Sequence, residues 1–428
     1  MTLESISQFL HGLPSAEFFS SAAFWAYFAM VVVALRLLPR RGTVGDLLLL
    51  GANVLMLLAL PQFNGVALLI YGGLTVVTYG IGLALNEGPL AKRPSSRLPL
   101  AILGVVLVLF VLAVFKYRFL QALVLQDKSL LGSGASDFIF LVGISFSSFK
   151  AIHFLIESFK GTIKHPRLLD TLNFLLFFPA FVSGPINRFN DFIAHSARAN
   201  RAPWRDDFST GAERIIHGLF KKFVITVLLF PYTVIGTKIP LGEMAPWQVL
   251  LCLYAYALYF YIDFSGYTDL AIGSARLLGF TLPENFNQPF LKKNLQQLWA
   301  NWHMSLTGWL TDYVYWPLVR KLRSNEMLRK YPLVISNLAI IVTFFLCGAW
   351  HGPTFNFILW GLYHGIGIAA VNVYQKWKRQ LRHPITLKYF TSPLSYGLGV
   401  VLSFNFFALG LLFILDAQQL ASVLGQLF

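Results

Sequence analysis

Charged residues are scarce in this chain. Only 12% of its 428 residues are Asp, Glu, Lys or Arg, while 56% are hydrophobic, and a soluble domain carries about 25% charged residues. This composition excludes an ordinary soluble enzyme and is typical of a polytopic membrane protein. We therefore predict a single integral-membrane domain over residues 1–428, although the length alone would suggest roughly two or three soluble domains.

Acidic residues and cysteines are also few. Asp and Glu number 19 against 34 Lys and Arg, which gives a formal net charge of +15. Basic residues in short loops fit the positive-inside rule better than nucleic-acid binding, and they would suit an acidic soluble partner. The two cysteines, Cys252 and Cys347, lie in apolar runs, so we expect small buried side chains and no disulfide framework.

The sequence lacks the short motifs of several enzyme classes. No P-loop, dinucleotide-binding fingerprint or GxSxG nucleophile motif occurs in a suitable context. Three histidines gather in one part of the chain, at His303, His351 and His364, but their spacings do not match a helical pair of zinc ligands. We expect no metal site and no tightly bound cofactor.

Long apolar runs are plentiful, and a membrane-spanning helix needs about 20 mainly apolar residues. They lie at about 19–38, 46–61, 65–85, 98–116, 138–158, 171–185, 213–238, 246–262, 332–350, 353–374 and 394–416. The predicted fold class is therefore all-α, with about eleven membrane helices. The short runs near 46–61 and 171–185 are also compatible with re-entrant or tilted helices.

One polar stripe lies inside the run at 138–158. Lys150, His153 and Glu157 recur at three- and four-residue spacing, so a helix places them on one face. Two interpretations remain open for them. One is an internal ion pair that joins helices, and the other is a direct role in function.

The stretch from Tyr261 to Gly365 holds three histidines with several Asp and Asn residues nearby. Ionisable groups at membrane depth usually face a cavity, pair with each other or do chemistry. We expect residues 263–267 to interrupt an aromatic helix and residues 281–284 to begin a new one. Residues 295–319 are amphipathic. They carry His303 beside an aromatic stripe, which favours a position at the rim of a cavity.

His351 is the best candidate for chemistry. It follows an apolar helix and precedes Gly352 and Pro353, so its ring would be accessible. An imidazole with an ordinary pKa can take a proton from a hydroxyl or a thiol near neutral pH. For His364, in a following apolar helix, a packed position and a functional one are both open.

Four motifs carry a resemblance to a known family. They read DFSGYTDLAIG, ENFNQPF, WHMSLTGWLTDYVY and AWHG followed by WGLYHG, and they are densest over 259–366. In this order they resemble the membrane-bound O-acyltransferase (MBOAT) family, in its bacterial branch of alginate O-acetylation and teichoic-acid D-alanyl transfer.

The resemblance implies a ring of membrane helices, with re-entrant or interfacial helices, around a central funnel or tunnel. It implies that His351 is the catalytic histidine and His303 its companion. Further candidate substrate contacts are Asp263, Asn285, Asn301, Ser305, Asp312 and His364. Asn301 and Thr311 stand where the family commonly has basic residues, which bears on the donor or acceptor contact.

The implied function is O-acyl transfer of an acetyl or D-alanyl group to a hydroxyl of a cell-envelope polymer or a relay protein. The donor would be a cytoplasmic thioester, either acyl-CoA or a phosphopantetheinyl acyl carrier protein, and a periplasmic or extracellular partner would receive the group. We expect a multi-pass protein of the bacterial inner membrane. Alternatives from other classes are a transporter or flippase and a non-catalytic scaffold of an envelope-polymer complex.

Overall fold

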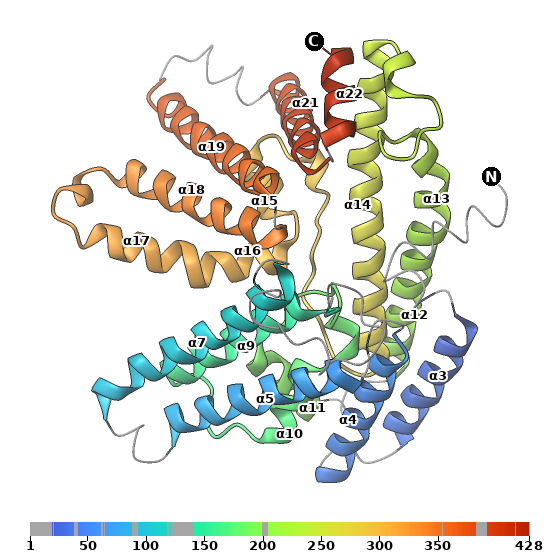
Figure 1. The fold of residues 1–428 in the computed structure, drawn as a ribbon, viewed down its shortest axis with the longest axis vertical. Helices are drawn as coiled ribbons and strands as arrows, with labels where there is room; N and C mark the ends of the chain where they lie inside the picture. Colours follow the sequence, from blue (N-terminus) through green and yellow to red (C-terminus); the bar gives the residue numbers. More distant parts are fainter. Residues whose placement is uncertain are drawn as a thin grey trace. The chain divides into compact units, whose positions relative to one another are not determined.

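The computed structural model of the chain is helical throughout the part that it describes (Figure 1). The described residues are 19, 21–37, 42–60, 63, 65–87, 93–117, 120, 141–198, 204–352, 354–381, 392–415 and 417–427. Every regular element in these ranges is a helix and none is a strand, which confirms the all-α prediction. The chain divides into two compact units, Met1–Leu219 with Tyr267–Pro283, and Phe220–Gly266 with Glu284–Phe428. The prediction of one domain stays a prediction.

Helices long and apolar enough to cross a membrane number seven among the described residues. They are Gly65–Asn86, Ser95–Lys116, Trp204–Tyr232, Pro246–Leu277, Pro332–His351, Phe355–Lys378 and Pro393–Ile414. Two shorter apolar helices cover Phe24–Leu37 and Thr43–Leu58. The expected count of about eleven is therefore not confirmed within these ranges.

Two of the expected spans are interrupted or too short. The run at 138–158 forms α9 (Ile144–Lys160), which has 17 residues. The run at 171–185 forms α10 (Leu168–Leu175), which has only 8 residues. Beyond α10 the chain turns into a short 3-10 helix that contains Pro179, a residue with no N–H to continue a helix.

The first unit is built from helices in chain order. They are α3 (Ala22–Leu37), α4 (Thr43–Leu58), α5 (Gly65–Asn86), α7 (Pro94–Lys116), α9, α10, η2 (Phe178–Ala180), α11 (Phe189–Arg198), most of α12 (Trp204–Phe220) and the end of α14 (Pro246–Leu277). α9 packs against both α5 and α7. Its Phe154 is fully buried, so α9 lies at the centre of this unit.

The polar stripe on α9 forms hydrogen bonds. The Lys150 ammonium donates to the Leu175 carbonyl at 3.5 Å. The Phe189 N–H donates to His153 Nε2 at 2.9 Å, and Glu157 accepts from Lys160, three residues along α9. Lys150 therefore joins helices through a backbone carbonyl and not through the expected ion pair.

The second unit begins in the middle of a long helical segment. Its elements are η3 (Lys221–Ile225), α13 (Thr226–Leu229), η4 (Phe230–Tyr232), η5 (Leu241–Glu243), the first part of α14, η6 (Pro289–Leu291), α15 (Leu295–Ala300), α16 (Met304–Leu310), η7 (Thr311–Tyr315), α17 (Trp316–Arg323), η8 (Leu328–Lys330), α18 (Pro332–His351), α19 (Phe355–Lys378), α21 (Pro393–Gly410), η9 (Leu411–Ile414) and α22 (Ala417–Leu427). Two of these, η3 and η7, are π-helices.

α14 corrects one prediction. It continues unbroken through residues 263–267, where we expected an interruption. The polar groups at this point have partners, because Lys222 pairs with Asp263 at 2.6 Å and Lys221 donates to Ser265 at 2.9 Å. With these groups satisfied, the aromatic helix has no reason to open.

Two further expectations in this region are wrong. Residues 281–284 do not begin a helix, and the next helical turn is η6. Residues 295–319 are not one amphipathic helix either, since the chain breaks between α15 and α16. That break is where His303 lies.

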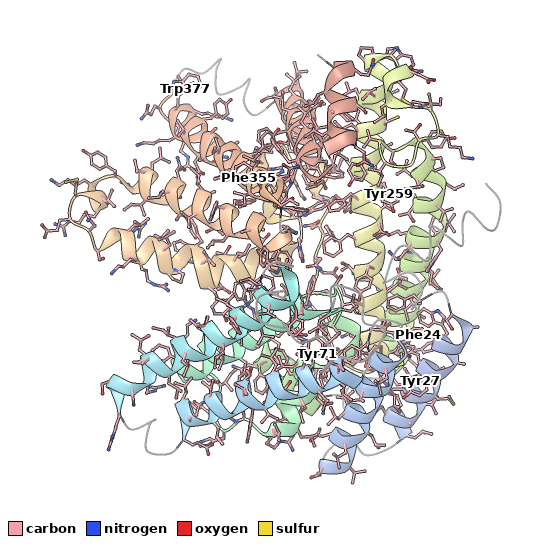
Figure 2. The ribbon with its side chains drawn as sticks, in the orientation of Figure 1. Phe24, Tyr27, Tyr71, Tyr259, Phe355 and Trp377 are labelled. Atoms are coloured by element: carbon pink, nitrogen blue, oxygen red, sulfur yellow. The ribbon has the colours of Figure 1, made fainter. Side chains whose placement is uncertain are left out.

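α18 and α19 touch backbone to backbone. A Cβ atom on Gly348 would come within 2.2 Å of the Phe357 carbonyl oxygen, and one on Gly361 within 2.2 Å of the Phe344 carbonyl oxygen. Small residues permit such close packing between membrane helices. Phe355 and Trp377 mark the two ends of α19 (Figure 2) and are 66% and 51% exposed, as aromatic side chains at a membrane interface would be.

Candidate functional site

One face of α18 leads to His351. Ile340, Thr343, Phe344, Cys347 and His351 follow one another at intervals of one, three or four residues, so they share a face of the helix. All five line one cavity of the second unit. The close packing of α18 on α19 fixes the direction in which this face points.

His351 is the last residue of α18. Its side chain is exposed, and its ring meets the edge of Trp360 with the centroids 5.0 Å apart. The carboxyl end of a helix carries a partial negative charge, which stabilises a cation there. An imidazolium formed when His351 accepts a proton is therefore favoured at this position.

His303 has an unusual backbone. Its φ of 42° and ψ of 52° lie in the left-handed region, which few residues other than glycine adopt. The His303 carbonyl accepts the Thr307 N–H at 3.0 Å and so begins α16. Strained backbone of this kind is concentrated at functional sites.

Asn285 holds the chain in this conformation. Its carbonyl accepts the Met304 N–H at 2.9 Å, and its side-chain Oδ1 accepts from Ser305 through both N–H, at 3.2 Å, and Oγ, at 2.6 Å. Asn285 is fully buried. Three hydrogen bonds from one residue therefore fix the two positions that follow His303.

The imidazole of His303 is buried and neutral. It is 4% exposed and lies edge-on to Phe264 with the ring centroids 4.8 Å apart. Burial, and to a lesser degree the nearby His351, lower the pKa of His303 to about 3, because a charged ring would lose its hydration. A neutral imidazole has one N–H donor and one nitrogen acceptor.

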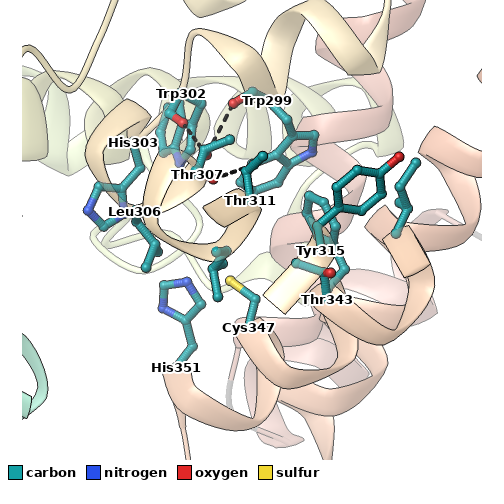
Figure 3. A pocket seen from close by; sticks show the side chains of 13 residues that line it. Trp299, Trp302, His303, Leu306, Thr307, Thr311, Tyr315, Thr343, Cys347 and His351 are labelled. Atoms are coloured by element: carbon teal, nitrogen blue, oxygen red, sulfur yellow. Dashed lines mark hydrogen bonds between the residues drawn. The ribbon is translucent and has the colours of Figure 1, made fainter. Parts of the chain in front are cut away.

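A cavity of about 200 Å³ joins the two histidines (Figure 3). Its lining residues are Trp299, Trp302, His303, Leu306, Thr307, Leu310, Thr311, Tyr315, Ile340, Thr343, Phe344, Cys347 and His351. They come from α15, α16, η7, α18 and the turn that contains His303. Small-molecule sites are commonly apolar hollows of this type with a few polar groups that converge.

A family assignment follows from comparison of this chain with known proteins. Residues 92–400 match the sequence profile of the membrane-bound O-acyltransferase family, and they include both histidines and every residue that lines the cavity. The chain belongs to the membrane-bound O-acyltransferase family. The resemblance seen in the motifs is thereby confirmed. Because the family is membrane-bound and the chain has several long apolar helices, this is a multi-pass membrane protein.

Its relatives are named as acyltransferases of two kinds. A teichoic acid D-alanyltransferase of Bacillus subtilis is 33% identical over 282 residues, which cover 64% of this chain and 68% of the relative. A probable alginate O-acetylase of Pseudomonas aeruginosa is 33% identical over 308 residues, which cover 71% of this chain and 56% of the relative. A teichoic acid D-alanyltransferase of Streptococcus thermophilus is 31% identical over 255 residues, or 58% and 61% of the two chains. The match thus covers less than two thirds of the last two relatives.

All six predicted substrate contacts of this O-acyltransferase, Asn285 and Ser305 included, lie outside the cavity lining. Asp263 pairs with Lys222 on the neighbouring helical segment. The Asn301 amide donates to the Gln297 carbonyl at 2.8 Å and so caps α15. The Asp312 side chain is exposed. Their roles in substrate binding stay predictions, as do those of Asn285 and Ser305, which hold the backbone beside His303.

His364 also lies outside the lining. It is fully buried, and its ring is surrounded by the rings of Trp299, Trp360, Tyr363, Phe406 and Phe407. Neither ring nitrogen has a hydrogen-bond partner in the described part of the chain. The geometry favours the packed interpretation, with His364 supporting Trp299 and Trp360 from behind.

Several lining residues were not predicted. Cys347 and Thr343 lie one and two turns before His351 on α18, and Leu306 and Leu310 lie one turn apart on α16. A helical spacing counted backwards from His351 identifies the α18 residues from sequence. No comparable signal marks Tyr315, because its direction depends on the π-helix η7, a type of distortion that is frequent at functional sites.

Proposed function

We propose that this chain transfers an acyl group, acetyl or D-alanyl, from a thioester to the hydroxyl of a cell-envelope polymer or of a relay protein. The observation that carries the proposal is that His303 and His351 line the same cavity. One of them is buried and the other exposed. This pairing offers a fixed hydrogen-bond donor and an accessible base to two reactants that meet between them.

His351 acts as the general base. It accepts the proton of the acceptor hydroxyl while that oxygen attacks the thioester carbonyl, and it then returns the proton to the departing thiolate. The position at the carboxyl end of α18 stabilises the imidazolium between these two steps. No covalent intermediate on the protein is needed.

His303 acts on the other side of the reacting carbonyl. Because its ring stays neutral, it keeps one N–H that can donate to the carbonyl oxygen as negative charge develops there. Asn285 and the strained backbone fix this donor in advance. Such preorganisation lowers the cost of forming the tetrahedral intermediate.

Donor, partner and location belong to the same proposal. The donor is an acyl-CoA or a phosphopantetheinyl acyl carrier protein on the cytoplasmic side, and the product leaves on the outer face through a periplasmic or extracellular partner. The excess of 34 basic over 19 acidic residues supports an acidic carrier. The bacterial relatives support the inner membrane as the location.

The decisive experiment measures acyl transfer by the purified protein. Acetyl-CoA and a D-alanyl carrier protein serve as donors, and alginate and teichoic acid, the polymers in the relatives' names, serve as acceptors. His351→Ala should lower turnover by about 10²–10⁴-fold, the contribution expected of a general base. The matched control is His217→Ala, because His217 is an exposed histidine of α12 in the other unit. Equal turnover of wild type and His351→Ala would remove His351 from the mechanism.

A further inference from the structure

The cavity beside the two histidines carries no fixed charge. None of its thirteen lining residues is Asp, Glu, Lys or Arg. The acidic residue next in sequence to the lining, Asp312, follows Thr311 but is exposed and does not line the cavity. A charged group inside the cavity would therefore have no opposite charge to pair with, which is unfavourable in a dry environment.

The three threonine hydroxyls of the lining donate to backbone carbonyls. Thr307 donates to the Trp302 carbonyl at 3.1 Å and Thr311 to the Thr307 carbonyl at 2.7 Å (Figure 3). Thr343 donates to the Ala339 carbonyl at 2.7 Å. In each case the hydroxyl proton is used within its own helix or turn. The threonines therefore have no hydroxyl proton left to donate into the cavity, and much of the remaining lining is aromatic or aliphatic.

An ammonium group fits these surroundings poorly. A primary ammonium carries three N–H donors, each of which needs an acceptor. The faces of Trp299 and Trp302 attract cations, and the threonine oxygens of the lining can accept a hydrogen bond. Neither carries the negative charge that would offset the desolvation of an ammonium. A carboxylate on the acyl group fits no better, because His303 stays neutral and offers a single N–H.

The size of the cavity limits the acyl group as well. An apolar protein cavity of roughly 150 Å³ binds benzene, so this one of about 200 Å³ has room for roughly six to eight non-hydrogen atoms. This space matches a short acyl group in size. The uncharged lining and the small volume both favour a short, neutral acyl group.

We propose that this cavity selects a short, neutral acyl group and rejects an acyl group that carries an ammonium or a carboxylate. The inference rests on the proposed function and narrows it, since of the two acyl groups considered above it favours acetyl over D-alanyl. The recognising chemistry is the uncharged wall formed by α16, η7 and α18, with the histidines at the reacting end.

The test uses two probes of nearly equal shape. Isobutyryl and D-alanyl thioesters of N-acetylcysteamine differ only in a methyl group that replaces the ammonium. Equilibrium dialysis of the radiolabelled probes against full-length His351→Ala protein measures binding without turnover. We expect isobutyryl to bind at least tenfold more tightly than D-alanyl, and a succinyl probe to bind as weakly as D-alanyl. D-alanyl binding equal to or tighter than isobutyryl, or no binding of either, would overturn the inference.

Substitutions then locate the selectivity. Thr343→Asp places a carboxylate in the wall and should invert the preference toward D-alanyl, while the neutral isostere Thr343→Asn should keep the wild-type order. Ile340→Trp fills the cavity and should weaken isobutyryl binding at least tenfold. Unchanged binding in Ile340→Trp would place the probe elsewhere and contradict the proposal. If Thr343→Asp does not fold, the comparison of the two probes still decides.

The two proposals fail in different ways. Selective isobutyryl binding in His351→Ala, together with no acyl transfer by wild type, would reject the proposed function and keep the cavity inference. Efficient transfer of D-alanyl by wild type would do the reverse.

Discussion

His303 and His364 are both buried, yet their surroundings differ. His303 lies on a left-handed turn between two short helices and faces a cavity. His364 lies inside the long helix α19, where aromatic rings enclose it. A Cβ atom at Gly410 would come within 2.5 Å of its Nε2, so that side of the ring has no space even for a methyl group.

This contrast teaches that burial alone does not identify a reactive histidine in a membrane protein. At 4% and 0% exposure the two residues cannot be separated. What separates them is the empty volume next to one ring and the packed Gly410 next to the other. A cavity borders His303, whereas His364 packs against the indoles of Trp299 and Trp360.

The largest expected difference in turnover is between variants of His303 and His364. His303→Asn keeps a residue type that tolerates the left-handed backbone but removes the imidazole donor. We expect a loss of about 10²–10³-fold in turnover, the range seen when one oxyanion donor is removed. His364→Leu should reduce turnover by less than about tenfold while lowering thermal stability, since it removes buried ring contacts.

These two predictions are tested by measuring turnover of the thioester donor and the melting temperature of each purified variant. A His364→Leu protein with normal stability and a loss of turnover as large as that of His303→Asn would reverse the comparison. It would also support the predicted substrate contact of His364.

Gly410→Ala tests the packing on the side of the His364 ring that faces Gly410. The added methyl must displace the His364 ring or shift α21, and such overpacking costs about 1–3 kcal/mol. Gly397→Ala on the same helix is the matched control, because nothing lies within 4 Å of a Cβ atom there. Thermal unfolding in detergent should therefore separate the two variants, and equal melting temperatures would show that the His364 cluster is loosely packed.

The sequence predicted the two cavity histidines but not their geometry. The motif around His351 and the end of an apolar run before it were enough to single it out. The hydrogen bond from Ser305 to the Asn285 side-chain oxygen joins residues 20 positions apart. No local sequence pattern encodes such a contact. Sequence reasoning could therefore not foresee this contact, and the substrate roles of both residues stay predictions.

The errors of element prediction have a similar origin. Asp263 and Gly266 look like a helix break because charge and glycine disfavour a membrane helix. Lys222 lies 41 residues earlier and supplies the ion pair that lets α14 continue. The helix expected at 281–284 was wrong because Pro283 and Glu284 form a typical helix start that no helix follows. The first error arose because the partner of Asp263 is distant in sequence, and the second because no helix continues after the start signal.

The smallest expected effect concerns pH. The pKa of His303 is lowered from 6.5 to about 3 on folding, so only the unfolded chain binds this proton between those values. Stability from this group is therefore complete above pH 6.5 and falls as the pH decreases toward 3, by at most about 1.4 kcal/mol per pH unit. His303→Asn should lack this contribution.

The contribution of His303 to stability is measured by comparing melting temperatures at pH 7 and pH 5. The wild type should lose more stability between these two values than His303→Asn does. An equal loss in both proteins would show that His303 takes up its proton without unfolding, and that its surroundings are wetter than the cavity lining suggests.

The glycine contact between α18 and α19 has an evolutionary consequence. With no side chain between Gly348 and Gly361, the two helices form a hairpin whose halves cannot slide or tilt independently without a clash. His351 and Trp360 are thereby carried on a single rigid arm. Single substitutions at Leu306, Leu310 or Thr311, in α16 and the π-helical turn, would then reshape the hollow and leave the base in place.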